Sequence, residues 1–188
     1  MKYNFLVIEG NIGSGKTYLS RKIAKDFNGK LILEEFADNP FLPKFYKESE
    51  KNALPLELFF MAERFNQLND NKNTTDLFSD LLIADYSFFK SKLFAQNNLT
   101  KDELNLFNRL YEIMFSSVRK PDLLIYIHSD IKRLQENIKI RGREFEQDIK
   151  DDYLKSIEDR YFDYIKKQRE FPVLIIDVSS IDFVNDEI

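Results

Sequence analysis

The chain has 188 residues, of which 43% are hydrophobic and 32% charged, with a formal net charge of −4 and no cysteine. This length suits one domain over residues 1–188, and the charge gives no reason to expect nucleic acid binding. The absence of cysteine excludes disulfides and thiolate metal sites. The sequence has no apolar run of ~20 residues and no signal-peptide layout. We therefore expect a cytoplasmic protein that does not bind membranes.

Five short apolar runs alternate with helical stretches along the chain. They are rich in valine, isoleucine and leucine and nearly continuous, as are strands buried on both faces of a parallel sheet. The runs cover residues 5–9, 31–34, 81–85, 123–128 and 173–178. We therefore predict an α/β fold with a five-stranded parallel sheet flanked by helices.

Three of the intervening stretches carry clear helix signals. Pro55 suits the first turn of a helix that runs to about Leu68. Thr100 and Glu103 form a capping box ahead of apolar residues at helical spacing. Residues 152–168 place their apolar side chains on one face, which predicts a helix before the last strand.

A phosphate-binding loop directly follows the first predicted strand. The segment fits the pattern G-x-x-x-x-G-K-[ST], in which glycines let successive backbone N–H groups point at phosphate oxygens. The helix starting near Lys16 adds its positive dipole end. Lys16 should reach the β- and γ-phosphates, and the Thr17 hydroxyl should bind Mg²⁺. The predicted ATP-binding residues are Gly10, Asn11, Ile12, Gly13, Ser14, Gly15, Lys16 and Thr17.

Acidic residues end two of the predicted strands. Glu34 and Glu35 close the second run, and Asp85 closes the third. In open α/β sheets, ligands bind beyond the carboxyl ends of the strands. An acid at this edge can hold Mg²⁺, which we expect of Asp85 together with Thr17. A second acid further out can accept a proton from an attacking hydroxyl group.

Arg141 and Arg143 bracket Gly142 at the end of a predicted helix. Arginines that fold over a transferring phosphoryl group stabilise its charge. Gly142 offers a break at the end of the helix, so residues 137–148 are expected to move as a lid.

Together these segments resemble the deoxynucleoside kinase family, which includes deoxycytidine, deoxyguanosine and bacterial deoxyadenosine kinases. The resemblance spans nearly the whole chain. The matching residues run from Glu9 to Thr17, from Arg141 to Arg143, and include Glu34, Asn39, Pro40, Phe41, Glu146 and Gln147. It implies a P-loop kinase-type three-layer fold, ATP and Mg²⁺ as cofactors, and phosphorylation of the 5′-hydroxyl of a deoxynucleoside. Likeness to the bacterial members favours a purine, deoxyadenosine first, and a homodimer is implied.

The resemblance assigns roles to further residues. Glu34 matches the general base that takes the 5′-hydroxyl proton. Tyr46 and Glu146 match the positions that grip the 3′-hydroxyl of the sugar. Glu57 and Arg64, seven residues apart in the sequence and therefore on one helix face, match two positions that read the base.

The lid and the strand ends depart from the family pattern. Arg141 and Arg143 match lid arginines, but a further one is replaced by Asn137. Glu35 stands where the family usually has proline. Tyr86, an expected substrate contact, replaces the arginine that normally helps to hold the 5′-oxygen near the general base, and this bears on catalytic competence.

The base-reading positions depart as well. Glu57 replaces the family's glutamine, and Ser91 replaces the acid that partners the base-reading arginine, here Arg64. An ionised carboxylate only accepts hydrogen bonds, whereas an amide both donates and accepts. The hydrogen-bonding pattern read from the base therefore differs from that of known members.

Two other functions stay open at this point. A nucleoside monophosphate kinase of thymidylate kinase type would need extra basic residues for the acceptor phosphate, and Glu34 would suit it poorly. A non-catalytic nucleotide sensor, motivated by Tyr86, would bind ATP without turnover on any acceptor.

Overall fold

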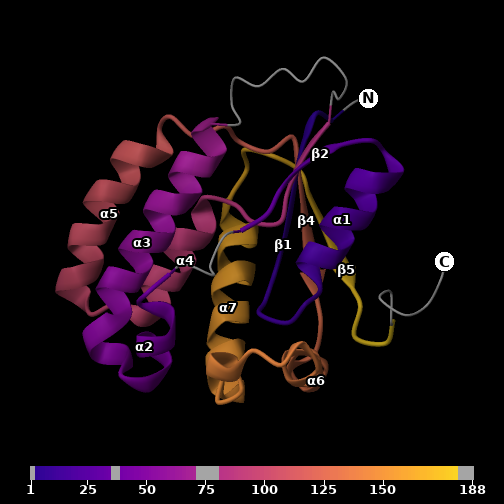
Figure 1. Cartoon of the computed structure of the whole chain (residues 1–188). Coiled ribbons are helices and arrows are strands. Elements are labelled where there is room, and N and C mark those ends of the chain that lie inside the picture. Colours follow the sequence, from indigo (N-terminus) through magenta and orange to yellow (C-terminus); the bar gives the residue numbers. More distant parts are fainter. Residues whose placement is uncertain (1–2, 35–38, 71–80, 182–188) are drawn as a thin grey trace. The chain divides into compact units, whose positions relative to one another are not determined.

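The structure is a computed structural model that describes residues 3–34, 39–70 and 81–181. The chain divides into two compact units, and Figure 1 labels most of their helices and strands. The first unit comprises Met1–Leu33, Thr75–Tyr86 and Lys120–Ile188, and the second comprises Glu34–Thr74 and Ser87–Arg119. The expectation of one domain over residues 1–188 stays a prediction.

The first unit is built on a five-stranded, all-parallel sheet with the order β2-β3-β1-β4-β5. Its strands are β1 (Phe5–Gly10), β2 (Lys30–Ile32), β3 (Leu82–Ala84), β4 (Leu123–His128) and β5 (Val173–Asp177). Parallel strands need crossover connections. The helices of this unit are α1 (Lys16–Asp26), α6 (Ile131–Arg141) and α7 (Asp151–Lys167), with a short 3₁₀ helix over Glu144–Glu146. The predicted five-stranded parallel sheet flanked by helices is confirmed.

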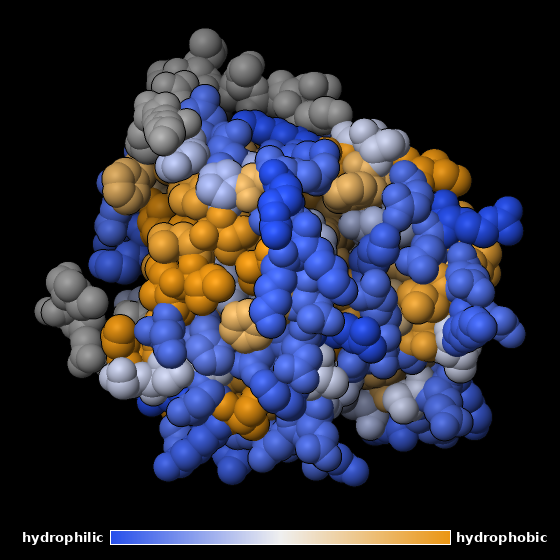
Figure 2. Space-filling view, turned by 180° about the vertical axis from the view of Figure 1, so that it is seen from behind, coloured by the Kyte–Doolittle hydropathy of each residue, from blue (hydrophilic) through white to orange (hydrophobic). Residues whose placement is uncertain are grey.

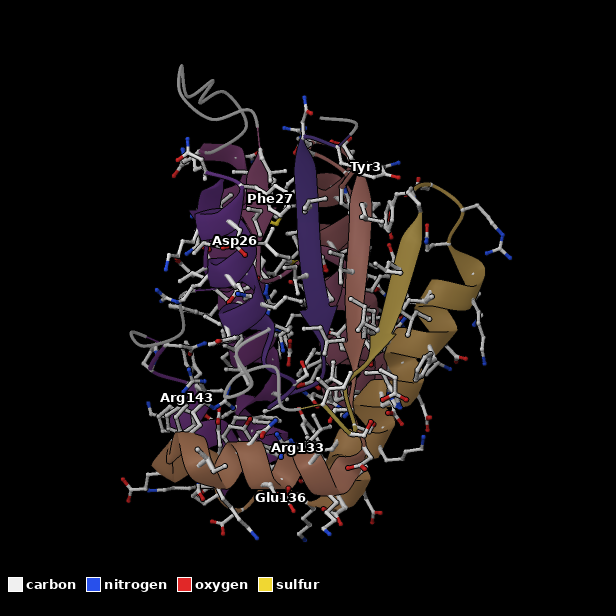
Figure 3. All side chains as sticks on the ribbon, turned by 90° about the vertical axis from the view of Figure 1, so that its right-hand side faces the viewer. Tyr3, Asp26, Phe27, Arg133, Glu136 and Arg143 are labelled. Atoms are coloured by element: carbon white, nitrogen blue, oxygen red, sulfur yellow. The ribbon has the colours of Figure 1, made fainter. Side chains whose placement is uncertain are left out.

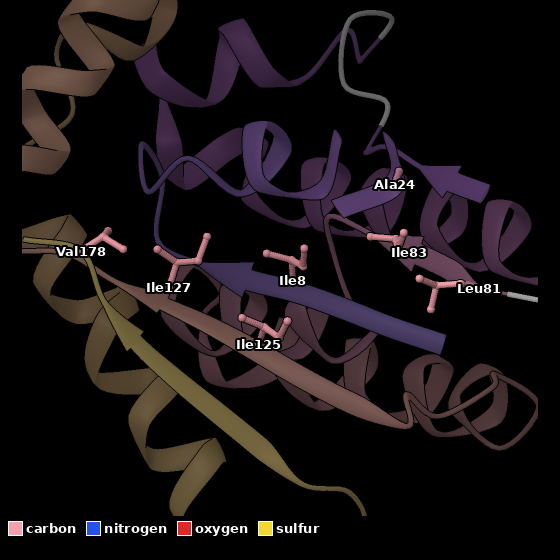
Figure 4. Packing of buried hydrophobic residues seen from close by; sticks show 7 residues of the cluster. All are labelled: Ile8, Ala24, Leu81, Ile83, Ile125, Ile127 and Val178. Atoms are coloured by element: carbon pink, nitrogen blue, oxygen red, sulfur yellow. The ribbon is translucent and has the colours of Figure 1, made fainter. Parts of the chain in front are cut away.

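Different helices cover the two faces of this sheet, with α1 on one face and α7 on the other (Figures 1 and 4). Side chains alternate between the faces of a strand. Ile8 therefore packs in the core on the α1 side, whereas Tyr126 contacts Tyr161 of α7, with ring centroids 5.2 Å apart. The core cluster on the α1 side consists of Ile8, Ala24, Leu81, Ile83, Ile125, Ile127 and Val178. Each fully buried isoleucine there contributes about 2 to 3 kcal/mol.

Helix α6 lies across the carboxyl ends of β1, β4 and β5, as Figure 3 shows. This edge of an open parallel sheet is where ligands bind. The same edge carries the loop from β1 to α1, so α6 and the phosphate-binding loop are neighbours within the first unit.

The second unit consists of helices packed through aromatic side chains. They are α2 (Leu42–Lys47), α3 (Ser49–Asp70), α4 (Phe89–Asn98) and α5 (Lys101–Phe115). The ring of Phe88 stacks on Tyr111 with centroids 5.1 Å apart and also stacks on Phe115. The capping box is confirmed, because the backbone N–H of Thr100 donates to the carboxylate of Glu103 over 2.9 Å.

The predicted start of one helix at Pro55 is wrong, because Pro55 lies inside α3. The helix begins at Ser49, where the side-chain amide of Asn52 donates to the carbonyl of Glu48 over 2.9 Å. Pro55 has no N–H to donate to the carbonyl of Lys51. Lys51 is exposed, so water can bond that carbonyl, and the helix tolerates the missing bond.

The face shown in Figure 2 is mostly hydrophilic, with apolar residues gathered in patches. Exposed apolar residues include Leu174 and Ile175 on the edge strand β5, and Leu106 and Ile113 on α5. No helix in the described part of the chain has both the length and the apolarity needed to cross a membrane.

Candidate active site

The loop between β1 and α1 has the backbone conformation that its sequence predicts. Gly13 and Gly15 have φ values of 83° and 86°, which residues other than glycine rarely adopt. A Cβ atom on Gly13 would also lie 2.8 Å from the carbonyl oxygen of Leu134 in α6. No side chain of the described residues caps the start of α1 at Gly15, so backbone N–H groups stand at the positive end of this helix.

Two asparagines attach this loop to its surroundings. The amide of Asn11, which is buried, donates to the carbonyl of Leu154 in α7 over 2.7 Å. The amide of Asn137 in α6 donates to the carbonyl of Gly13 over 2.8 Å. Asn137, which replaces a lid arginine of the family pattern, therefore holds α6 against the phosphate-binding loop.

The side chain of Lys16 folds back on the loop. Its Nζ donates to the carbonyls of Gly10 and Asn11 over 2.9 and 2.8 Å. The ammonium group is thus held against the loop itself. Its role toward phosphate stays a prediction.

The two predicted Mg²⁺ ligands lie side by side in the first unit. Oγ1 of Thr17, in the first turn of α1, donates to Oδ2 of Asp85, which follows β3, over 2.5 Å. A hydroxyl and a carboxylate are the hard oxygen ligands that Mg²⁺ prefers. Within the described residues, no group of three or more His, Cys, Asp and Glu residues could hold a metal. The pair fits an ion that keeps several waters and also binds substrate phosphates.

The predicted lid residues form one ion-pair cluster. Arg141 is the last residue of α6, and Gly142 ends the helix in the left-handed region with φ 70°. Arg141 donates to one carboxylate oxygen of Glu146, and Arg143 donates to the other over 3.1 Å. Figure 3 shows Arg143 at one end of α6. The expected sugar-gripping acid, Glu146, is therefore buried and paired with both lid arginines.

In the second unit, the predicted general base is held between two cations. Nε and Nη2 of Arg64 in α3 donate to Oε1 of Glu34 over 2.8 and 2.6 Å. Nζ of Lys90 in α4 donates to Oε2 of the same carboxylate over 2.5 Å. The side chains of Arg64 and Lys90 are 4% and 9% exposed. Buried charges of this kind need partners, and here each cation has one.

These contacts decide the protonation state of Glu34. Burial works to raise the pKa of this carboxyl, but the charges and hydrogen bonds of Lys90 and Arg64 outweigh it. They hold the pKa of Glu34 well below its usual range. Glu34 is therefore a carboxylate throughout the neutral and mildly acidic range, ready to accept a hydrogen bond from a hydroxyl group.

The two base-reading positions share a buried face of α3, as their spacing predicts. Glu57 and Arg64 are 1% and 3% exposed. Nη1 of Arg64 donates to Oγ of Ser91 over 2.8 Å, so Ser91 does partner the arginine. The amide of Asn98 donates to Oε1 of Glu57 over 2.7 Å.

Glu57 is electrostatically different from Glu34. Burial raises the pKa of Glu57 to about 7, although the hydrogen bond from Asn98 and the charges of Arg64 and Lys90 lower it. The charge of Glu34 works in the raising direction. Two carboxyl groups of one unit thus have opposite pKa shifts, which is a common property of functional sites.

The remaining predicted substrate contacts are placed as follows. Tyr46 lies in α2, half-buried, with its ring edge-on to Phe45 at 5.5 Å. Tyr86 belongs to the first unit and is completely buried. Glu35 lies outside the described residues. The roles of Tyr46 and Tyr86 toward a substrate stay predictions.

Sequence reasoning missed two residues of this arrangement, Lys90 and Asn98. Lys90 stands after two phenylalanines and directly before Ser91. A lysine within such an apolar stretch is a signal for a buried cation, but nothing in the sequence names its partner. Asn98, the last residue of α4, carries no signal of its own in the sequence.

Comparisons with known proteins agree with this arrangement. The sequence profile of the family described as deoxynucleoside kinase matches residues 6–188. The deoxyguanosine kinase of Bacillus subtilis (strain 168) is 35% identical and aligns over 96% of this chain and 89% of that protein. The deoxyadenosine/deoxycytidine kinase of the same organism is 30% identical over 99% of this chain and 88% of that protein.

A solved structure supports the fold independently. The deoxyadenosine kinase from M. mycoides with bound dATP matches with a TM-score of 0.81 at 24% identity, covering 92% of this chain and 90% of that chain. The family profile and the two relatives confirm the resemblance in the sequence. The chain belongs to the deoxynucleoside kinase family, whose named members are transferases that phosphorylate deoxynucleosides.

Proposed function

We propose that this protein transfers the γ-phosphoryl group of ATP to the 5′-hydroxyl of a purine deoxynucleoside. The observation that carries the proposal is the carboxylate of Glu34, kept ionised between Arg64 and Lys90. A half-buried carboxylate that stays ionised can accept first the hydrogen bond and then the proton of an attacking hydroxyl group.

The donor side of the reaction uses the first unit. The backbone of the loop from Gly10 to Thr17 would bind the triphosphate, with Lys16 on the β- and γ-phosphates. Thr17 and Asp85 would hold Mg²⁺, which supplies positive charge to the phosphate oxygens. Arg141 and Arg143 would neutralise the charge that develops on the transferred group.

The acceptor side uses Glu34. The 5′-oxygen attacks the γ-phosphorus, the bond from that phosphorus to the β–γ bridging oxygen breaks, and the hydroxyl proton passes to Glu34. The products are the deoxynucleoside 5′-monophosphate and ADP. Because the pKa of Glu34 is low, its main contribution is to orient the hydroxyl. A largely dissociative transition state transfers the proton late, so it needs no strong base.

The sugar and the base would be recognised by separate groups. We assign Tyr46 and Glu146 to the 3′-hydroxyl, and Glu57 and Arg64 to the base. Pairing with Glu146 then gives Arg141 and Arg143 a second task, which is to hold the sugar-binding acid in place.

The purine base that Glu57 can recognise depends on whether Glu57 is protonated. As a carboxylate, it accepts hydrogen bonds from N1–H and N2–H of guanine. As a carboxylic acid, it donates to N1 of adenine and accepts from the N6 amino group. A pKa of about 7 makes both forms available near neutrality. We therefore propose that deoxyguanosine is preferred when Glu57 is ionised and deoxyadenosine when it is protonated.

The other candidate functions make different predictions for one assay. Labelled γ-phosphate of ATP is offered with Mg²⁺ to deoxyadenosine, deoxyguanosine, deoxycytidine, thymidine and thymidine monophosphate. We expect label in the purine 5′-monophosphates. Transfer only to thymidine monophosphate would favour the monophosphate kinase, and ATP binding without transfer to any acceptor would favour the sensor. A homodimer stays a prediction that sedimentation would test.

A further inference from the structure

Lys90 is a buried lysine that neither the fold nor the recognised sequence pattern accounts for. Its Nζ donates to Oε2 of Glu34 over 2.5 Å, and it also lies 5.6 Å from the ring centroid of Phe94. Lysine is rarely buried unless its charge is paired. Here the partner is the carboxylate on which the proposed reaction depends, 56 residues away in the sequence.

Lys90 and Glu34 belong to the same unit, and the side chain of Lys90 is 9% exposed whereas that of Glu34 is 17% exposed. We infer that Lys90 is a positioning residue that fixes the orientation and the ionised state of Glu34. This inference rests on the proposed role of Glu34 as the acceptor of the hydroxyl proton.

The geometry gives Lys90 a different task from Arg64. Arg64 binds Oε1 through two N–H groups, whereas Lys90 binds Oε2. Two cations on different oxygens fix the rotation of the carboxylate about its last bond, which Arg64 alone does not. Orientation of a reacting group matters because a displacement of about 1 Å can lower a rate about 100-fold.

The charges support the same conclusion. Burial alone would raise the pKa of Glu34, and the attraction to Lys90 is the largest influence that lowers it, ahead of Arg64. Without Lys90, one of the two charges that offset burial is lost. The pKa of Glu34 then rises, so that the carboxylate is lost to protonation at a higher pH.

The test replaces Lys90 with Met, which keeps the length and apolar body of the side chain but removes the charge. We expect kcat to fall about 100-fold with little change in the KM for ATP. The acid limb of the pH profile of kcat should move up by about 1 to 3 units. Lys90→Arg should restore most of the activity, because it returns a charged donor.

The matched control is Lys92→Met, two residues further along α4. Lys92 pairs with Glu112 at 2.8 Å on a more exposed part of the same helix. This variant should keep the kcat and the pH profile of the unchanged protein. Lys90→Gln, which keeps a donor without the charge, is a second neutral variant in case Lys90→Met does not fold, and the same shift of the acid limb is expected.

Two results would overturn the inference about Lys90. One is near-normal turnover by a folded Lys90→Met variant. The other is a reduced kcat with an unshifted pH profile, which would make Lys90 only a structural lysine. Failure of the proposed function is recognised separately, because the unchanged protein would then transfer no phosphate to any deoxynucleoside, or Glu34→Gln would keep its activity.

Discussion

The hydroxyl oxygen of Thr17 lies 2.5 Å from Oδ2 of Asp85, although Thr17 is in the first turn of α1 and Asp85 follows β3. The sheet explains this contact, because β1 and β3 are adjacent and parallel. Their carboxyl ends therefore present the two residues at the same edge. We interpret the pair as the Mg²⁺ ligands of a kinase.

Replacing Thr17 with Val or Asp85 with Asn should weaken Mg²⁺ binding, because each change removes a charged or polar oxygen ligand. Even the loss of groups that only support metal ligands costs about 10- to 100-fold in affinity or activity. Titration of activity with Mg²⁺ at saturating ATP should show a correspondingly higher midpoint. Asp26→Asn, at the exposed end of α1, is the control. An unchanged midpoint in both site variants would contradict the assignment.

Asn137→Ala should weaken ATP binding without changing the KM for the deoxynucleoside. The change removes the hydrogen bond that holds α6 to Gly13 in the loop. One such bond contributes about 1 kcal/mol, equivalent to about a fivefold loss of affinity. Calorimetric titration with ATP measures it, with Asn105→Ala on α5, an exposed asparagine, as the control. Unaltered ATP affinity would show that the bond does not shape the loop.

The preference between the two purines should depend on pH. Glu57 faces Asn98 and Lys90 from α4, Arg64 from its own helix, and Glu34, and its pKa is about 7. As the pH rises from about 6 to about 8, Glu57 ionises, and the ratio of its ionised to its protonated form rises about 100-fold. The ratio of kcat/KM for deoxyguanosine to that for deoxyadenosine should therefore rise by up to about 100-fold. A competition assay with both substrates measures it, and a constant ratio would contradict the role of Glu57.

Glu57→Gln should make the ratio of kcat/KM for the two purine deoxynucleosides independent of pH and move it toward deoxyadenosine. The reason is that glutamine always has one donor and one acceptor group.

The free energy of unfolding gives a second measurement of the ionisation of Glu57. The pKa of Glu57 is raised from 4.5 to about 7 on folding, so the folded state resists ionisation and loses stability as the pH rises through this window. Relative to Glu57→Gln, the unchanged protein should lose about 3 kcal/mol between the two ends of the window. Equal pH dependence of the two proteins would contradict burial of an ionisable Glu57.

Tyr86→Arg should not raise activity, because Lys90 already supplies a cation to Glu34. Tyr86 is completely buried, so an arginine there places a charge in the interior and removes the tyrosine from its packing. The free energy of unfolding should fall by roughly 3 to 5 kcal/mol. Denaturant unfolding and kcat are measured on the same preparation. A large gain in kcat would instead show that position 86 limits the reaction, and would contradict the expectation.

The features that could be predicted from the sequence are those that one local segment determines. The five apolar runs predicted the strands of the sheet, because both faces of the sheet are covered. The glycines of the loop predicted its backbone conformation, because that conformation requires glycine. Strand ends were less certain. The second strand ends at Ile32 rather than at Glu34, and Glu34 instead pairs with Arg64 within the second unit.

The partners of the site residues could not be predicted, because they depend on contacts between distant segments. Glu34 is 30 residues from Arg64 and 56 from Lys90. Its carboxylate could have belonged to a solvated turn on sequence grounds alone. The pairing of Arg141 and Arg143 with Glu146 is local, yet sequence reasoning assigned the two arginines to the lid and Glu146 to the sugar, because they matched different family positions.

The measurement that tests the central claim most directly is the rate at which Glu34→Gln forms a purine deoxynucleoside 5′-monophosphate from ATP. Glutamine has nearly the same shape but does not accept the hydroxyl proton. The account predicts a loss of kcat of about 1,000-fold, with ATP affinity retained and with full activity in the control Glu50→Gln, which lies exposed at the start of α3. Near-normal turnover by Glu34→Gln, or phosphate at a position other than the 5′-oxygen, would contradict it.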